Sequence, residues 1–92
     1  MFIVAREYDF APAGVLAQAG AHVRLTLSNQ GTVLHSWVLK DSLGNTLEKV
    51  TAAAGQIAQL DFNAPLAAGA YTFVCDVSDH AQLGMKGQLT VR

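Results

Sequence analysis

Hydrophobic and polar positions alternate with a period of two over several short stretches of this chain. In the clearest one, Val23, Leu25 and Leu27 alternate with polar residues, as expected for a strand with one buried and one solvent-facing side. Similar alternation predicts strands at residues 35–39, 58–62, 71–75 and 87–91, and a weaker alternation adds 15–18 and 46–50. No stretch of comparable length has the 3.6-residue period of a helix.

The N-terminal stretch is apolar but irregular. Residues 2–10 have the composition of a strand, yet Arg6 interrupts the alternation. We therefore expect a bulge at Arg6, or a strand that changes there from one sheet to the other.

Turn-forming residues separate the predicted strands about every ten residues. Clear examples are 29–31, 41–45 and 65–69, which are rich in Gly, Asn, Asp and Pro. The chain has no internal repeat, low-complexity tract or linker. These features predict an all-β sandwich of about seven to eight short strands, folded as a single domain over residues 1–92.

Composition and charge exclude several classes of function. The 92 residues are 51% hydrophobic and 14% charged, which is too apolar for a disordered chain. A net charge of −1 supplies no field for nucleic acid or an anionic membrane surface. The apolar runs are too short for a membrane span, and the start lacks signal-peptide features, so we expect any export signal to have been removed or never present. The single cysteine, Cys75, excludes an internal disulfide.

Four potential metal donors are brought together by the phase of the predicted strands. His35 is in phase with the inward-facing Trp37, Cys75 ends the inward-facing side of its strand, and Met85 continues the inward phase of the C-terminal strand. His80 lies midway in the loop between the last two strands. One thiolate, two imidazoles and one thioether form a donor set that suits copper, because sulfur favours Cu(I) and imidazole accepts both oxidation states.

Two segments of the chain resemble a known family. Residues 69–91, with the spacing Cys75-x4-His80-x4-Met85, closely resemble the C-terminal ligand loop of the cupredoxins, the type 1 (blue) copper proteins. The segment Asn29-x-Gly31-x3-His35-Ser36-Trp37 resembles the part of these proteins that carries the first histidine ligand. The resemblance covers essentially the whole chain and is strongest to small electron carriers of the plastocyanin and auracyanin kind.

This resemblance implies a Greek-key, cupredoxin-like sandwich with one copper per chain, held by His35, Cys75, His80 and Met85. It also implies that Ser36 supports the site without binding the metal, with its backbone N–H near the cysteine sulfur. The implied function is to shuttle single electrons between redox partners by Cu(II)/Cu(I) cycling, without catalysis. By the same resemblance, we expect a monomer in the periplasm or another extracytoplasmic setting.

The partners implied are redox proteins that dock transiently at an apolar face around His80. An exposed edge of His80 would be the electron port, surrounded by Ala81, Leu83 and Gly84. We expect residues 32–34 beside this face, and residues 15–16 as further neighbours. Uncharged residues of this kind suit brief contact through a small interface.

The loop departs from the family pattern in one place. Relatives often carry Val-Pro-Gly before the loop histidine, whereas this chain has Val77-Ser78-Asp79. Asp79 therefore adjoins His80, and Asp76 adjoins Cys75. Two carboxylates near the metal bear on the reduction potential, although Ser-Asp also suits a simple turn.

Two other functions are compatible with a copper site on this fold: a delivery or storage module, and a cupredoxin domain excised from a larger copper oxidoreductase. A delivery protein normally exposes several Met or Cys ligands, and this chain has two Met and one Cys. A copper enzyme needs a second metal site, yet only His22 remains once the two proposed ligands are used. A cysteine hydrolase is disfavoured because nothing places Cys75 at a helix N-terminus.

Three residues have structural interpretations. His22 falls on the solvent-facing phase of its strand and is predicted to be a surface histidine. Trp37 is predicted to pack in the core, and Tyr71 to be a hydrogen-bonded corner tyrosine of the sandwich type.

Overall fold

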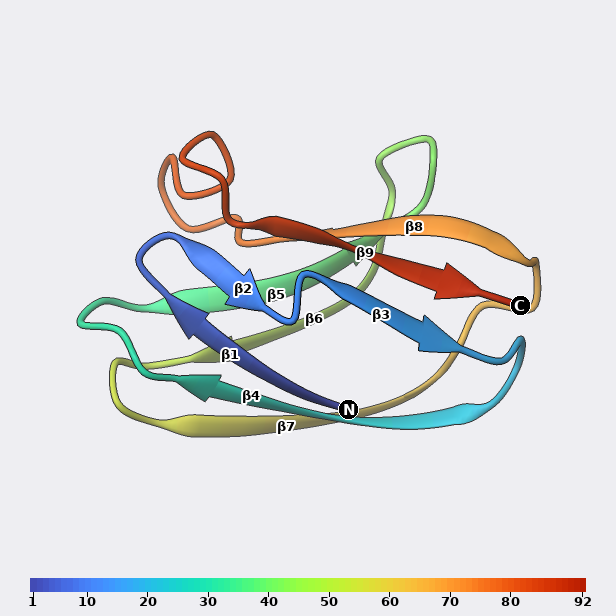
Figure 1. Ribbon diagram of the computed structural model, residues 1–92, viewed down its shortest axis with the longest axis horizontal. Helices are drawn as coiled ribbons and strands as arrows, with labels where there is room; N and C mark the ends of the chain where they lie inside the picture. The colour runs from blue at the N-terminus through green and yellow to red at the C-terminus, as the bar shows by residue number, and fades with distance from the viewer.

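The computed structural model describes residues 1–92 and contains nine strands and no helix. The strands are β1 (Phe2–Arg6), β2 (Asp9–Ala11), β3 (Gly14–Ala17), β4 (His22–Asn29), β5 (His35–Lys40), β6 (Thr46–Ala52), β7 (Ile57–Asn63), β8 (Gly69–Val74) and β9 (Lys86–Val91). One sheet has the order β2-β1-β4-β7 and the other the order β3-β9-β8-β5-β6. Figure 1 shows the two sheets facing each other as a sandwich, which confirms the predicted fold class.

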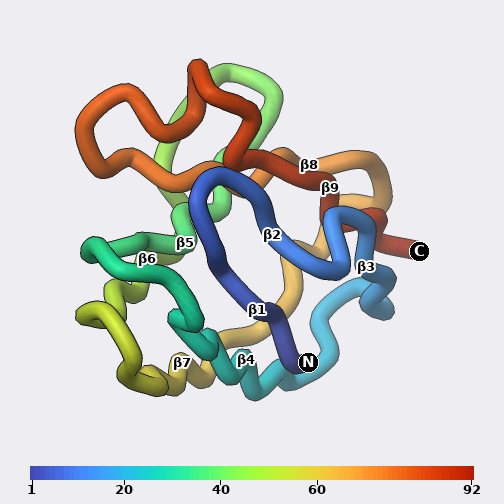
Figure 2. The backbone as a smooth tube through the Cα atoms, turned by 60° about the vertical axis from the view of Figure 1, so that its left-hand side comes forward, coloured from blue at the N-terminus to red at the C-terminus, as the bar shows by residue number.

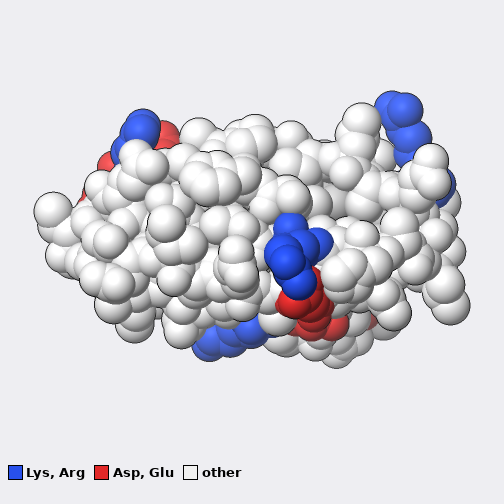
Figure 3. Space-filling model, turned by 90° about the horizontal axis from the view of Figure 1, so that it is seen from below, with Lys and Arg blue, Asp and Glu red and all other residues white.

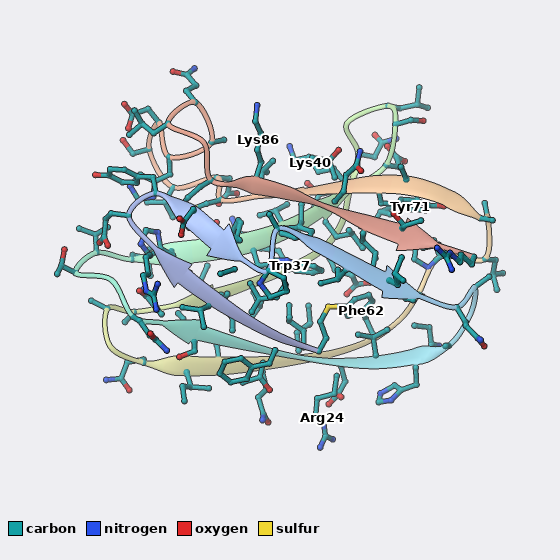
Figure 4. The ribbon with its side chains drawn as sticks, in the orientation of Figure 1. Arg24, Trp37, Lys40, Phe62, Tyr71 and Lys86 are labelled. Carbon is teal, nitrogen blue, oxygen red and sulfur yellow. The ribbon has the colours of Figure 1, made fainter.

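The core forms where the alternating apolar sides of the two sheets meet. Val23, Leu25 and Leu27 on β4 are all buried, as the period of two predicted. Trp37 on β5 is fully buried, with its ring centroid 5.8 Å from that of Phe62 on the opposite sheet. Figure 4 shows both rings between the sheets and Arg24 pointing away from them. Burying side chains of this size contributes roughly 1.5–3 kcal/mol each, so the core alone supplies a strong driving force for folding.

The N-terminal segment differs from its prediction. Arg6 pairs with Asp9 across a tight turn that joins β1 to β2 in one antiparallel hairpin, so there is neither a bulge nor a change of sheet at Arg6. The alternation is lost at Arg6 because a turn of charged and polar residues begins there. The change of sheet comes after Ala11, at Pro12, which has no N–H to donate to a ladder. β3 then pairs in parallel with β9. The strand number is nine because the predicted strand at residues 2–10 is divided into β1 and β2.

Three structural predictions are confirmed at the level of single residues. Trp37 belongs to the core, as described above. The hydroxyl of Tyr71 donates to the carbonyl of Ala67 at 2.7 Å, which is the contact expected of a corner tyrosine. His22 is exposed, and its Nε2 lies 3.4 Å from the carboxylate of Asp61.

Few charges interrupt the outer surface. Figure 3 views the molecule from the side of β4 and β7 and shows a few small groups of basic and acidic residues on a largely uncharged face. This distribution agrees with the low charge content of the chain, 14% of residues. The structure contains no helix that could span a membrane.

Three loops converge at one end of the sandwich. They are the β1–β2 turn, the β4–β5 loop and the β8–β9 loop (residues 75–85), all at the left in Figure 1. Figure 2 shows the β1–β2 turn passing directly beneath the β8–β9 loop. The β5–β6 turn lies at the opposite end of the sandwich. All the predicted metal donors lie in or beside the converging loops.

Candidate metal centre

Three of the predicted donors form one buried cluster. His35 opens β5 and Cys75 follows β8, and both are fully buried. The Cys75 Sγ lies 3.9 Å from Nδ1 of His35 and 3.4 Å from Nδ1 of His80. The donor atoms of these three residues all lie within 4.8 Å of one another. Strand phase therefore predicted correctly that His35 and Cys75 face inward, and the β8–β9 loop brings His80 to them.

The spacing of the cluster fits a metal ion bound between the three donors. Metal bonds of about 2.3 Å to sulfur and about 2.0 Å to nitrogen, meeting at a trigonal angle, place the two atoms about 3.7 Å apart. The observed Sγ–Nδ1 separations of 3.4 and 3.9 Å bracket this value. A Cys-His-His plane is also the donor set typical of blue-copper electron-transfer sites. The residues present therefore fit copper.

Met85 is tied to the cluster through its backbone. Its N–H donates to the carbonyl of His80, and its carbonyl accepts the N–H of Cys75, both at 3.1 Å. Its side chain is fully buried. These bonds close the β8–β9 loop on itself and place Met85 beside two members of the cluster. That its thioether binds the metal stays a prediction.

The β8–β9 loop holds His80 in a series of turns. The N–H of His80 donates to the carbonyl of Val77 at 3.1 Å, and the carbonyl of His80 accepts the N–H of Leu83 at 3.1 Å. Ser78 has a positive φ of 49°, so the Ser-Asp pair forms a turn in this sequence. The side chain of Asp79 is exposed, and its hydrogen-bond partner is the Ser78 hydroxyl at 3.5 Å.

Ser36 links the cluster sulfur to a charged pair. Its backbone N–H donates to Cys75 Sγ at 3.4 Å, as the resemblance implied. Its hydroxyl accepts the N–H of Asp76 at 2.9 Å and lies 2.6 Å from the Asp76 carboxylate. Lys49 Nζ lies 2.7 Å from the same carboxylate. The Lys49 ammonium, together with the Ser36 hydroxyl, holds the pKa of Asp76 below its usual value of 3.8. The negative charge of Asp76 is therefore paired.

The β1–β2 turn also reaches the cluster, which the sequence pattern did not reveal. Oε1 of Glu7 lies 3.6 Å from Nε2 of His35. The ring of Tyr8 packs against that of His80, with centroids 4.9 Å apart and planes tilted by 50°. Two consecutive turn residues thus contact both histidines. The only local signal was the run of polar and charged residues that interrupts the apolar stretch, which indicates a turn but not what the turn contacts.

The pKa values of the two facing groups, Glu7 and His35, are both lowered, which leaves Glu7 charged and His35 neutral. The N–H of Thr32 is the largest cause that lowers the pKa of Glu7 from 4.5 to about 2, so this carboxylate is charged at neutral pH. Burial lowers the pKa of His35 below its ordinary 6.5, although the negative charge of Glu7 opposes this change. His35 is therefore neutral at pH 7, which is the form that binds a metal.

Exposed apolar side chains lie on the two loops that carry or precede the histidines of the cluster. His80 is 6% exposed, so only a small part of this ring reaches solvent. Leu83, Val33 and Leu34 have exposed fractions of 51%, 40% and 46%; that they form a docking face around His80 stays a prediction. The expectation that residues 15–16 lie nearby is wrong: the parallel register pairs Leu16 with Thr90 near the far end of β9.

Comparison with solved structures places this fold among known copper proteins. Auracyanin B matches with a TM-score of 0.91 at 26% identity, covering 100% of this chain and 87% of that one. Auracyanin A, a blue copper protein from Chloroflexus aurantiacus, matches with a TM-score of 0.89 at 24% identity, covering 100% and 97%. The auracyanin of Roseiflexus castenholzii matches with a TM-score of 0.89 at 21% identity, covering 99% and 94%.

Larger proteins contain the same fold as one part. A multicopper oxidase matches with a TM-score of 0.77 at 17% identity, and the match covers 100% of this chain but 43% of the oxidase. No curated protein sequence matches the chain significantly. The family model for the cupredoxin-like domain matches residues 1–91. With a family match over almost its entire length, a cupredoxin sandwich and a buried Cys-His-His cluster, the chain belongs to the cupredoxin-like domain family.

Proposed function

We propose that this protein is a one-electron carrier with a single type 1 copper held by His35, Cys75, His80 and Met85. The observation that carries the proposal is the buried cluster in which Nδ1 of His35 and Nδ1 of His80 both face the sulfur of Cys75. When bound, copper supplies a Cu(II)/Cu(I) couple. The donor set accommodates both oxidation states, because sulfur favours the reduced ion and imidazole accepts either.

The protein's contribution is to hold the donors in place. His35 is fixed by its position at the start of β5, where its neighbour in the register is Ala52 on β6. Cys75 and His80 are fixed by backbone bonds to Met85. Donors that are already in position need little reorganisation when charge changes at the site. Rapid exchange of single electrons follows from this rigidity.

We propose no catalytic role. The cluster is buried, with exposed fractions of 0%, 0% and 6% for His35, Cys75 and His80, and such a site favours electron transfer over binding of a substrate. Burial also argues against a delivery or storage module, since a metal that is handed over must be reached by the acceptor's ligands. The match to part of a multicopper oxidase supports the second alternative, a domain of a larger oxidoreductase. For the chain itself, we favour a single domain that acts as a monomer.

Partners are proposed to dock over the apolar surface around His80. The exposed side chains of Leu83, Val33 and Leu34 would exclude water from a small contact, and small contacts are typical of short-lived redox complexes. The absence of charge on these side chains favours fast release. The family resemblance supports a proposed location in the periplasm or another extracytoplasmic compartment.

Adding Cu(II) to the apo protein and recording the visible spectrum tests the proposal. We expect one copper per chain and the intense thiolate-to-copper band of a type 1 site. Cys75→Ser should abolish the band because the thiolate is the electron donor of the transition. His22→Ala is the matched control, since His22 is exposed and outside the cluster, and should leave the band unchanged. A colourless copper complex of the parent, or colour that survives in Cys75→Ser, would contradict the proposal.

A further inference from the structure

One polar atom of the cluster lacks a hydrogen bond. Nδ1 of His35 faces the sulfur, while Nε2 on the other side of the ring is buried and has no hydrogen-bond partner. Leaving such an atom unpaired costs about 1–3 kcal/mol. The charged group in front of it is the carboxylate of Glu7, whose Oε1 lies 3.6 Å away. This distance is longer than a hydrogen bond but short enough for a strong electrostatic interaction.

The Glu7 carboxylate is held in this position by the loop that precedes His35. Its Oε1 accepts the backbone N–H of Thr32 at 2.6 Å and that of Val33 at 3.0 Å, and the Thr32 hydroxyl adds a third bond at 3.1 Å. Three donors on one oxygen fix the carboxylate and stabilise its charge. The carboxylate of Glu7 is therefore charged at neutral pH, and these three bonds hold its side chain in front of His35.

Gly31 provides the space that this arrangement needs. A Cβ added at Gly31 would collide with the Glu7 carboxylate, lying 2.8 Å from its Cδ. Gly31 is not among the glycines with a positive φ, so room for Glu7, and not an unusual backbone conformation, explains a glycine here. The β4–β5 loop therefore holds the carboxylate of Glu7 beside His35.

We infer that Glu7 is a positioning residue for His35, which rests on the proposed function of the cluster as a copper site. A carboxylate facing Nε2 favours the tautomer that carries its proton on Nε2 and leaves the lone pair of Nδ1 directed at the metal position. Histidine ligands commonly have such a partner for their second nitrogen, and it raises their basicity. Its negative charge also favours the more positive, oxidised metal. Glu7 therefore lowers the reduction potential.

The first test uses the apo protein, so that it does not depend on copper. Nitrogen NMR of the imidazoles should show His35 as the Nε2–H tautomer in the parent. In Glu7→Ala the same ring should populate both tautomers, whereas Glu7→Gln, which keeps an acceptor oxygen, should retain the parent tautomer. A His35 ring that stays in the parent tautomer in Glu7→Ala overturns the positioning role.

The second test measures the reduction potential with copper bound. Glu7→Gln removes the charge and keeps the size of the side chain, so the potential should rise while the visible band remains. The matched control is Asp41→Asn, because Asp41 accepts the N–H groups of Leu43 and Asn45 in the β5–β6 turn at the other end of the sandwich. This control should leave the potential unchanged.

The outcomes separate the two proposals. An unchanged potential in Glu7→Gln, or an equal rise in Asp41→Asn, overturns the role of Glu7 and leaves the copper site standing. A parent protein that never develops the blue band contradicts the proposed function, and the tautomer of His35 in the apo protein then still decides whether Glu7 positions the ring.

Discussion

The Ser36 hydroxyl donates its proton to the carboxylate of Asp76, at 2.6 Å, and not to the Cys75 sulfur, which lies 3.7 Å away. A hydroxyl has one proton, and a charged oxygen at short distance is the stronger acceptor. The donor that serves the sulfur is therefore the backbone N–H of Ser36, at 3.4 Å. A backbone donor survives any substitution except proline.

Ser36→Ala should accordingly separate stability from redox behaviour. The Asp76 N–H loses its acceptor, and an unpaired donor of this kind costs about 1–3 kcal/mol when buried. The reduction potential should shift only modestly, because the N–H to the sulfur remains. Denaturant unfolding of the apo protein and redox titration of the copper form measure the two effects. Ser28→Ala is the control, since the hydroxyl of this buried serine makes only a 3.4 Å contact with Gln30. A potential that moves as far as in a variant of a copper ligand would refute this division of roles.

Met85→Leu should keep copper and colour while raising the reduction potential. Leucine is of similar volume, and the two backbone bonds of residue 85 to Cys75 and His80 do not involve the side chain. Loss of a weak thioether donor destabilises Cu(II) more than Cu(I). Spectroscopy and redox titration of the variant measure both properties. Complete loss of copper binding would show that Met85 is a principal ligand.

The apo protein should be folded. Its 16 clustered buried apolar residues span both sheets and provide a core without any metal, unlike a zinc finger, in which metal binding drives folding. Copper should add stability through linkage, by about 2.7 kcal/mol when the free ion is at 100 times its dissociation constant. Circular dichroism of the metal-free chain and thermal unfolding at graded copper concentrations measure this. A random-coil spectrum for the apo chain would disprove the expectation.

Asp79→Asn should raise the reduction potential at low salt and raise it less at high salt. Reduction removes one positive charge from the metal, so a nearby carboxylate favours the oxidised form, and salt screens an exposed charge. The turn itself should persist, because the backbone carbonyl of Asp79 accepts the N–H of Leu83 in either variant. Redox titration at two ionic strengths decides the matter. A potential that does not rise at low salt would leave Asp79 with a role in the turn alone.

Local pattern was sufficient to predict much of the fold and the cluster. The buried side of β4 could be predicted because Val23, Leu25 and Leu27 face the core while the residues between them are polar. The same phase placed His35 and Cys75 inside, and family spacing added His80. Strand phase carries this information because successive side chains point to opposite faces.

Contacts between distant segments were not predictable in this way. Glu7 and Val33 are 26 residues apart, and they meet because β1 pairs in parallel with β4, a pairing that no local period encodes. The prediction of a bulge or a change of sheet at Arg6 was wrong for a related reason. A break in alternation is equally compatible with a bulge, a change of sheet or a hairpin, and only the tertiary pairing selects one.

The closed form of the β8–β9 loop has an evolutionary consequence. Three of the four proposed donors lie on this one segment, and Val74 pairs directly with Lys86 where it leaves and rejoins the sheet. Residues can therefore be inserted or deleted between these two positions without changing the register of either strand. Evolution can therefore vary the spacing of the donors, and with it the properties of the metal, by changing the length of this one loop while the rest of the sequence stays the same.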